Sequence, residues 1–166
     1  MAKYVLNTSE DDLDFVLIGI SCLENQYSLA ALIDDALKIK LFLSDYVPFN
    51  LKEGRIFKFS LYRFLDEELG LEYFFIPNSS NFEVPVAIGT NLNNTNTGDL
   101  FEGMDVDESV KLIKELPKTD YFLILKGEDL HNYQFKIMDK LKSFPEIIQI
   151  QAIEPHDLPS KRNLIF

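Results

Sequence analysis

The sequence predicts a single α+β domain spanning residues 1–166, with a mixed or antiparallel sheet and helices packed on one face. Near each end of the chain, a buried apolar segment is followed by an amphipathic helix. Between these two units lie two alternating segments joined by a short turn, which is typical of a β-hairpin. Strands and helices do not alternate strictly, which favours α+β over a parallel α/β sheet, and a split β-α-β arrangement of the ferredoxin-like or ACT-like kind fits the order.

The N-terminal unit follows a polar lead-in, residues 1–13. Residues 15–20 form a continuous apolar run that is typical of a strand buried on both faces. Asn25 can cap a helix over residues 26–38, because its side-chain oxygen can accept a backbone N–H of the first turn. Residues 39–43 alternate briefly and predict a short edge strand.

The hairpin is the clearest element in the middle of the chain. Pro48 and Gly54 bracket a loop before it. Residues 56–64 alternate, and residues 71–76 return as a second strand after a turn. The aromatic side chains expected in its core are Phe57, Phe59 and Phe74.

The pattern weakens after the hairpin. Residues 84–88 predict a short strand that Pro85 confines to a sheet edge. Residues 89–99 are rich in Asn, Thr and Gly and predict a loop. A short helix is then expected through Ile113, ended by Pro117.

The C-terminal unit consists of a strand, a helix and a strand. Residues 121–126 predict a buried strand, and Asp129 is expected to cap the helix that follows. Residues 147–153 predict the last strand, and residues 154–166 an extended tail. The inner face of the helix is expected to contain Leu130, Tyr133, Ile137, Met138 and Leu141.

The chain ends in three large apolar side chains, Leu164, Ile165 and Phe166. Leaving them in water would forfeit several kcal/mol of burial, in the range of about 1.5–3 kcal/mol for each side chain. The tail is therefore expected to dock, either on its own domain or on a partner protein, and these residues are the candidate partner-binding residues.

The composition excludes several classes of partner. The formal net charge is −11, which disfavours nucleic acid and anionic membranes because the field of the protein repels phosphate. The first residues lack the apolar run of a signal peptide, and no segment approaches the roughly 18 apolar residues of a membrane span. We therefore expect a cytoplasmic protein that binds neither nucleic acid nor membranes.

No catalytic, metal-binding or cofactor-binding motif is recognisable. Cys22 is the only cysteine, so no disulfide can form within the chain, and a structural thiol is expected. Its use as a nucleophile would need a base, and His131 and His156 lie far away in sequence; both are expected to be surface residues. We assign no cofactor.

Three acidic residues have alternative interpretations. Asp105 and Asp107 could hold Mg²⁺ as a pair of carboxylates, but they precede the expected helix, where acids cap free N–H groups. Asp120 could act as a general base, but an acid before a buried strand more often closes a turn by accepting backbone N–H groups. The structural interpretation is favoured in both cases.

The joint between the expected helix and the 121–126 strand contains Ile113, Glu115, Asp120 and Tyr121. With this spacing it resembles the signature of the IPExxxVDY family of small bacterial proteins. Lys114 and Thr119 stand where that signature has proline and valine. The chain length, the early strand and helix, and the last four residues are similar too. The resemblance implies a protein of the Bacteroidota type, without an assigned activity or catalytic residues. The matching residues, interpreted as a structural signature, are Ile113, Glu115, Asp120 and Tyr121.

Three functions remain open from the sequence. The favoured one is a non-catalytic module that acts through contacts with a protein partner or in a homo-oligomer, because chemical motifs are missing and sheet edges can pair with another chain. The second is an ACT-like regulatory domain that binds a small metabolite at a dimer interface, by fold analogy. The third is an enzyme that uses Asp105, Asp107 or Asp120.

Overall fold

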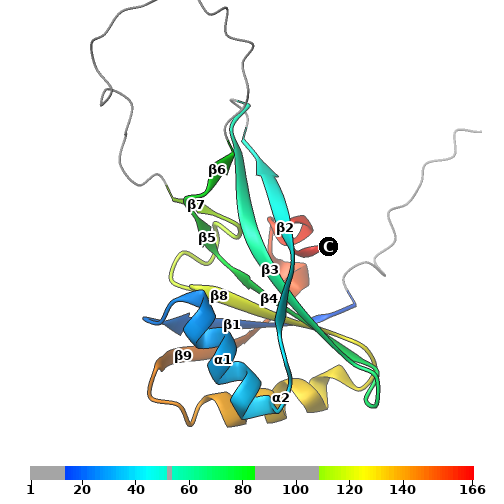
Figure 1. Ribbon diagram of the computed structural model, residues 1–166. Coiled ribbons are helices and arrows are strands. Elements are labelled where there is room, and N and C mark those ends of the chain that lie inside the picture. Colours follow the sequence, from blue (N-terminus) through cyan, green and yellow to red (C-terminus); the bar gives the residue numbers. More distant parts are fainter. Residues whose placement is uncertain (1–13, 52–53, 85–108) are drawn as a thin grey trace, which may run out of the picture.

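The computed structural model describes residues 14–51, 54–84 and 109–166, and it confirms the α+β class. In this part of the chain a seven-stranded sheet has the order β2-β3-β4-β8-β1-β9, with β6 paired to β3 (Figure 1). Every pairing in it is antiparallel. Its strands are β1 (Val16–Cys22), β2 (Phe42–Asn50), β3 (Ile56–Asp66), β4 (Leu71–Pro77), β6 (Glu83–Val84), β8 (Tyr121–Lys126) and β9 (Ile147–Ile153).

The remaining elements flank this sheet. The α-helices are α1 (Gln26–Leu37) and α2 (Leu130–Leu141), and a small second sheet pairs β5 (Ser79–Ser80) with β7 (Val110–Lys111). Two 3₁₀ helices, η2 (Pro155–Asp157) and η3 (Lys161–Leu164), follow β9. The tail is therefore not extended as predicted, because its residues turn back onto the sheet.

The split β-α-β arrangement is present. Strand β1 is antiparallel to both β8 and β9, so β8 and β9 run parallel to each other on either side of β1, joined by α2. Strand β8 is likewise antiparallel to both β1 and β4, so β1 and β4 run parallel to each other on either side of it. The segment that joins β1 to β4 contains α1, β2 and β3. These four strands and two helices have the connectivity of a ferredoxin-like unit, into which β2 and β3 are inserted.

The sheet has a core on each face. Strand side chains alternate, so Leu123 and Leu125 pack on the helix side, while Phe122 and Ile124 pack on the other. Both helices contribute to the first core, as predicted, with Leu130, Ile137 and Leu141 of α2 buried. The second core is closed by the segment around Ile113 and by the tail. It contains the predicted Phe57, Phe59 and Phe74.

Local signals were reliable at the start of α1. The side-chain oxygen of Asn25 accepts a hydrogen bond from Ser28 N at 3.0 Å, which confirms the predicted cap. At the start of α2 the prediction was wrong in detail. Asp129 adopts φ of 52°, and its carboxylate accepts hydrogen bonds from the Asn132 side chain instead of a backbone N–H.

Strand β2 is longer than the predicted segment 39–43 and runs through Pro48. It can do so because it lies at the edge of the sheet, where a missing N–H need not break a ladder. Its register against β3 shifts between Leu43 and Asp45, which marks a bulge. Of the predicted loop, residues 48–50 belong to β2, and Gly54 adopts φ of 77°.

The helix predicted through Ile113 is not formed in the described residues, where β7 and irregular turns occupy 110–120. The strand expected at 84–88 is described only as far as Val84, which belongs to β6. Asp105, Asp107 and the loop at 89–99 lie outside the described residues. Pro117 therefore follows a turn and not a helix. The residue that stabilises this turn lies elsewhere in the chain.

That residue is Asn78, which is fully buried directly after β4. Its side-chain oxygen accepts a hydrogen bond from Ile113 N at 2.8 Å, and its side-chain nitrogen donates to the carbonyls of Leu116 and Thr119, both at 2.9 Å. Its own backbone bonds Leu112 N and the Asp120 carbonyl, each at 2.8 Å. One side chain thus supplies the partners that the helix would have supplied.

Replacing this side chain tests its role. Asn78→Ala leaves the Ile113 N–H and the Thr119 carbonyl without their partners, so the free energy of unfolding is expected to fall by about 3 kcal/mol or more. Urea denaturation measures this change. Asn163→Ala is the matched control, because it removes one part-buried bond to the Leu112 carbonyl and should cost only about 1 kcal/mol. Equal losses in the two variants would contradict the role of Asn78.

Candidate functional site

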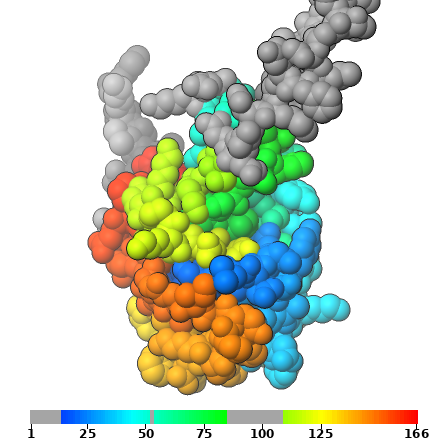
Figure 2. Space-filling model, turned by 90° about the vertical axis from the view of Figure 1, so that its left-hand side faces the viewer, coloured from blue at the N-terminus to red at the C-terminus, as the bar shows by residue number. Residues whose placement is uncertain are grey.

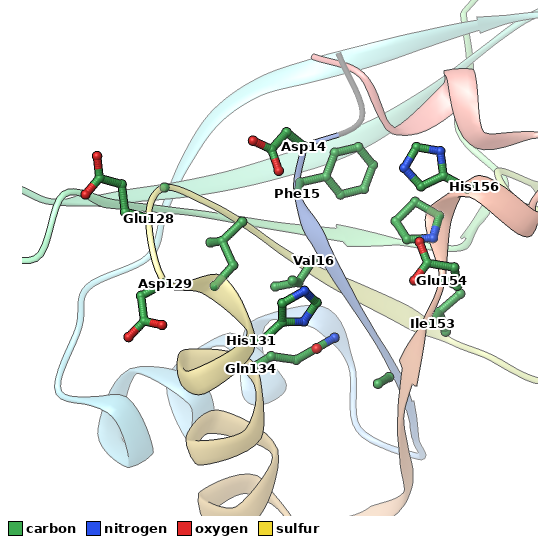
Figure 3. Close-up of a pocket in the computed structure, with 14 residues that line it drawn as sticks. Asp14, Phe15, Val16, Glu128, Asp129, His131, Gln134, Ile153, Glu154 and His156 are labelled. Atoms are coloured by element: carbon green, nitrogen blue, oxygen red, sulfur yellow. The ribbon is translucent and has the colours of Figure 1, made fainter. Parts of the chain in front are cut away.

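A cavity of about 800 Å³ lies where three segments distant in sequence meet: the start of β1, the turn from β8 into α2, and the end of β9 with η2 (Figure 3). This volume lies within the range of small-molecule sites. Phe15, Val16, Leu130 and Pro155, all buried, form its apolar wall. Both histidines of the chain, His131 and His156, line it, although they come from different elements.

The turn from β8 into α2 shapes this cavity. Gly127 adopts φ of 142°, and a Cβ atom there would lie 2.6 Å from the Gly70 carbonyl oxygen, so this position requires glycine. The side chain of Gln134 donates to the Leu17 carbonyl at 3.3 Å and ties α2 to β1 beside the opening. The Gly127 contact brings the turn from β8 into α2 close to the turn between β3 and β4, and the Gln134 bond joins α2 to β1.

The charged groups around the cavity are acidic. Asp14, Glu128, Asp129 and Glu154 belong to its lining, which contains neither Lys nor Arg. In Figure 3, Glu128 and Asp129 lie on the turn side and point away from the two histidines. In the described ranges, no group of three or more His, Cys, Asp or Glu side chains is placed to hold a metal ion. The cavity is suited to a small ligand with cationic character.

Cys22 and Asp120 lie in a different place, at the opposite end of β1. Two shallower hollows of about 410 and 290 Å³ adjoin there and share Pro77, Ser79 and Tyr121 in their linings. Cys22 is buried, and burial raises the pKa of its thiol, which favours the uncharged form. Neither histidine lines these hollows, so the structure does not bring a histidine base to Cys22.

Asp120 accepts a backbone N–H, but not within a turn of its own. Its carboxylate accepts from Cys22 N at 3.0 Å, and its own N–H donates to the Ile20 carbonyl at 3.0 Å. The next residue, Tyr121, donates its hydroxyl to the Glu24 carbonyl at 2.8 Å. The pKa of Tyr121 is raised to about 12, mainly by burial and to a smaller extent by the nearby Cys22 and Asp120. Together these bonds fasten the start of β8 to the end of β1.

The other two signature residues also make structural contacts. Ile113 is fully buried in the second core. Glu115 accepts a hydrogen bond from the Ser160 hydroxyl at 2.8 Å, and Asn163 reaches the Leu112 carbonyl, so the tail lies against this segment (Figure 2). The described contacts therefore place Ile113, Glu115, Asp120 and Tyr121 in one structural joint.

The three C-terminal residues divide between the core and the surface. Leu164 is fully buried, and the ring of Phe166 lies 6.0 Å from that of Phe74. Ile165 is exposed. The tail thus docks on its own chain, which is one of the two alternatives expected, and it leaves only Ile165 facing solvent for a partner.

A surface at the edge of the sheet was missed from the sequence. Phe42, Leu43 and Tyr46 of β2 are 56%, 42% and 46% exposed, and Tyr27 of α1 is 74% exposed. Tyr27 and Tyr46 both lie near Tyr62, and the ring centres of Tyr27 and Tyr62 are 6.3 Å apart. The pKa of Tyr62 is raised, mainly by its own burial and then by Tyr27 and Tyr46. We call Tyr27, Phe42, Leu43 and Tyr46 the edge patch. Phe42 and Leu43 fall in the predicted edge strand 39–43, but no alternation in residues 42–49 extends that strand to Tyr46.

Comparison of the chain with protein-family models, with curated proteins and with solved structures finds no match in any of the three. The resemblance to the IPExxxVDY family stays a prediction. Neither helix in the described residues has the length and hydrophobicity needed to cross a membrane.

The joint at Tyr121 generates a pH-dependent prediction. In the unfolded chain Tyr121 loses its proton near its ordinary pKa of 10.0, but in the folded protein only near 12. The contribution to stability is therefore fully present below pH 10 and is lost as the pH rises towards 12. Tyr121→Phe should flatten the fall of unfolding free energy over this window, measured by urea denaturation at several pH values. Because the variant also loses the bond to Glu24, the slopes and not the absolute values are compared; an unchanged slope would contradict the assignment.

Proposed function

We propose that this chain is a protein-interaction module that binds its partner at the outer edge of β2. The observation that carries this proposal is an edge strand of nine residues in which Phe42 to Tyr46 are all exposed, with three large apolar side chains among them. In the described part of the chain, β2 has a neighbouring strand on one side only. An open edge offers backbone hydrogen bonds to an extended segment, and the side chains beside it provide specificity.

Edge strands of soluble proteins are usually protected by charges, prolines and bulges. Strand β2 has a proline and a bulge, but Asp45 is its only charged residue. The opposite edge, β9, exposes one large apolar side chain, Ile148. The concentration of apolar surface on β2 therefore favours this edge as the interface. The excess negative charge and the free, buried Cys22 are compatible with a cytoplasmic site of action.

A display selection with random peptides tests this proposal. Peptides enriched on the wild-type protein should bind Tyr46→Ser about fivefold or more weakly, because truncating a central aromatic contact costs over 1 kcal/mol. Phe135→Ser is the matched control, since Phe135 is an exposed aromatic residue on α2, and it should bind as the wild type does. Enriched peptides that bind all three proteins equally would place the interface elsewhere.

A second function is favoured by the cavity beside α2. Its volume, apolar wall and acidic rim suit a regulatory domain that binds a small cationic metabolite.

Thermal shift against amines, amino acids and nucleotides tests this second function. A ligand at 100 times its Kd should stabilise the fold by about 2.7 kcal/mol. Glu154→Gln should weaken the shift caused by a cationic ligand, whereas Asp157→Asn, which changes charge outside the lining, should not. If no amine, amino acid or nucleotide raises the melting temperature, a regulatory site for these classes of ligand is excluded.

A further inference from the structure

The edge patch and the charges around it define a partner, and this inference rests on the proposed function. We propose that the partner is an extended segment in which apolar and basic residues alternate, and that it pairs with β2 so that a lysine or arginine lies beside Asp45. Its apolar side chains then lie on the side of α1, against Leu43, Tyr46 and Tyr27.

The ladder between β2 and β3 fixes which side chains share a face. Tyr46 lies opposite Ser60 and Leu43 opposite Tyr62, so both are on the helix side of the sheet. Asp45 lies opposite Leu61, which belongs to the second core, so its carboxylate is on the other side. A strand added to β2 continues this alternation, and one of its faces meets tyrosine rings while the other meets Asp45.

The charges on the two faces differ. On the helix side, the Lys58 ammonium lies 6.0 Å from the Tyr46 ring centre, so a basic side chain placed there would meet a like charge. On the other side, Asp45 forms no ion pair within the described residues, and one of its oxygens accepts only the adjacent Tyr46 N–H, at 2.7 Å. Arg63, two positions from Leu61 along β3, is engaged by Glu72. This arrangement places the basic residue beside Asp45 and apolar residues beside the tyrosines.

The apolar surface beside Asp45 supports the same assignment. Phe42, exposed, and Val47, half-buried, lie on its side of the sheet, opposite Arg63 and Phe59. The methylene stem of a lysine or arginine can lie along such side chains while its charged end reaches the carboxylate. The net charge of −11 adds a long-range attraction for a basic segment that no acidic segment would experience.

Two short peptides with the same apolar residues at alternate positions, and either lysines or glutamates between them, test the inference. They are titrated into the isotope-labelled full chain, and the amide signals of β2 are followed by NMR. The lysine peptide should bind the wild type about two- to fivefold more tightly at low salt, which is the range of a cross-strand ion pair, and the difference should shrink at high salt. Asp45→Asn should reduce the difference at low salt, leaving the part that the overall negative charge contributes, and Asp45→Lys should reduce it further. Asp157→Asn, with the same change in net charge but beyond β9, should preserve it.

The outcomes separate the two proposals. If both peptides shift β2 signals with equal affinity, or the glutamate peptide binds more tightly, the basic partner is overturned while the β2 edge stands. If neither peptide shifts β2 signals, both proposals fail. If β2 signals change with protein concentration in the absence of peptide, the occupant is a second copy of the chain, and the basic segment is again overturned.

Discussion

The hydrogen bonds of one buried side chain, Asn78, hold together the end of the molecule where β4 stops and β8 begins. An amide carries both donors and an acceptor, and here both are used by backbone groups that include the Ile113 N–H and the Thr119 carbonyl. The irregular segment that Asn78 organises leads into Asp120 and Tyr121, which in turn bind the end of β1 and the residue before the cap of α1. The strands meet correctly at this end because a polar network, and not apolar packing alone, sets their positions.

The elements predicted from the sequence are those whose causes are local. Apolar runs and alternation are visible within a few residues, and they predicted β1, the β3–β4 hairpin, β8 and β9; Asn25 predicted the start of α1. The prediction of a helix through Ile113 was wrong because Asn78, which bonds the backbone of Leu112 and Ile113, is distant in sequence. The tail was wrong for the same reason, since its 3₁₀ turns contact Leu112 and Glu115.

The candidate sites were harder to predict than the fold. The cavity with both histidines has no sequence signature, because its walls come from the two ends of the chain and from the start of α2. The edge patch was partly visible, because the predicted edge strand 39–43 contains Phe42 and Leu43 but neither Tyr46 nor Tyr27 of α1. The two sites lie towards opposite edges of the sheet, with β3, β4 and β8 between β2 and β1. A partner on β2 would therefore leave the cavity accessible.

The pairing of β1 has a consequence for how the protein is made. Both neighbours of this central strand, β8 and β9, are synthesised long after it. During synthesis β1 has no neighbouring strand to pair with until β8 has emerged, and its apolar residues stay unpacked until then. The β3–β4 hairpin and α1 can form early, but the sheet is completed only after β9 has emerged. The apolar residues of β1 therefore stay without their sheet partners until β8 and β9 have been synthesised.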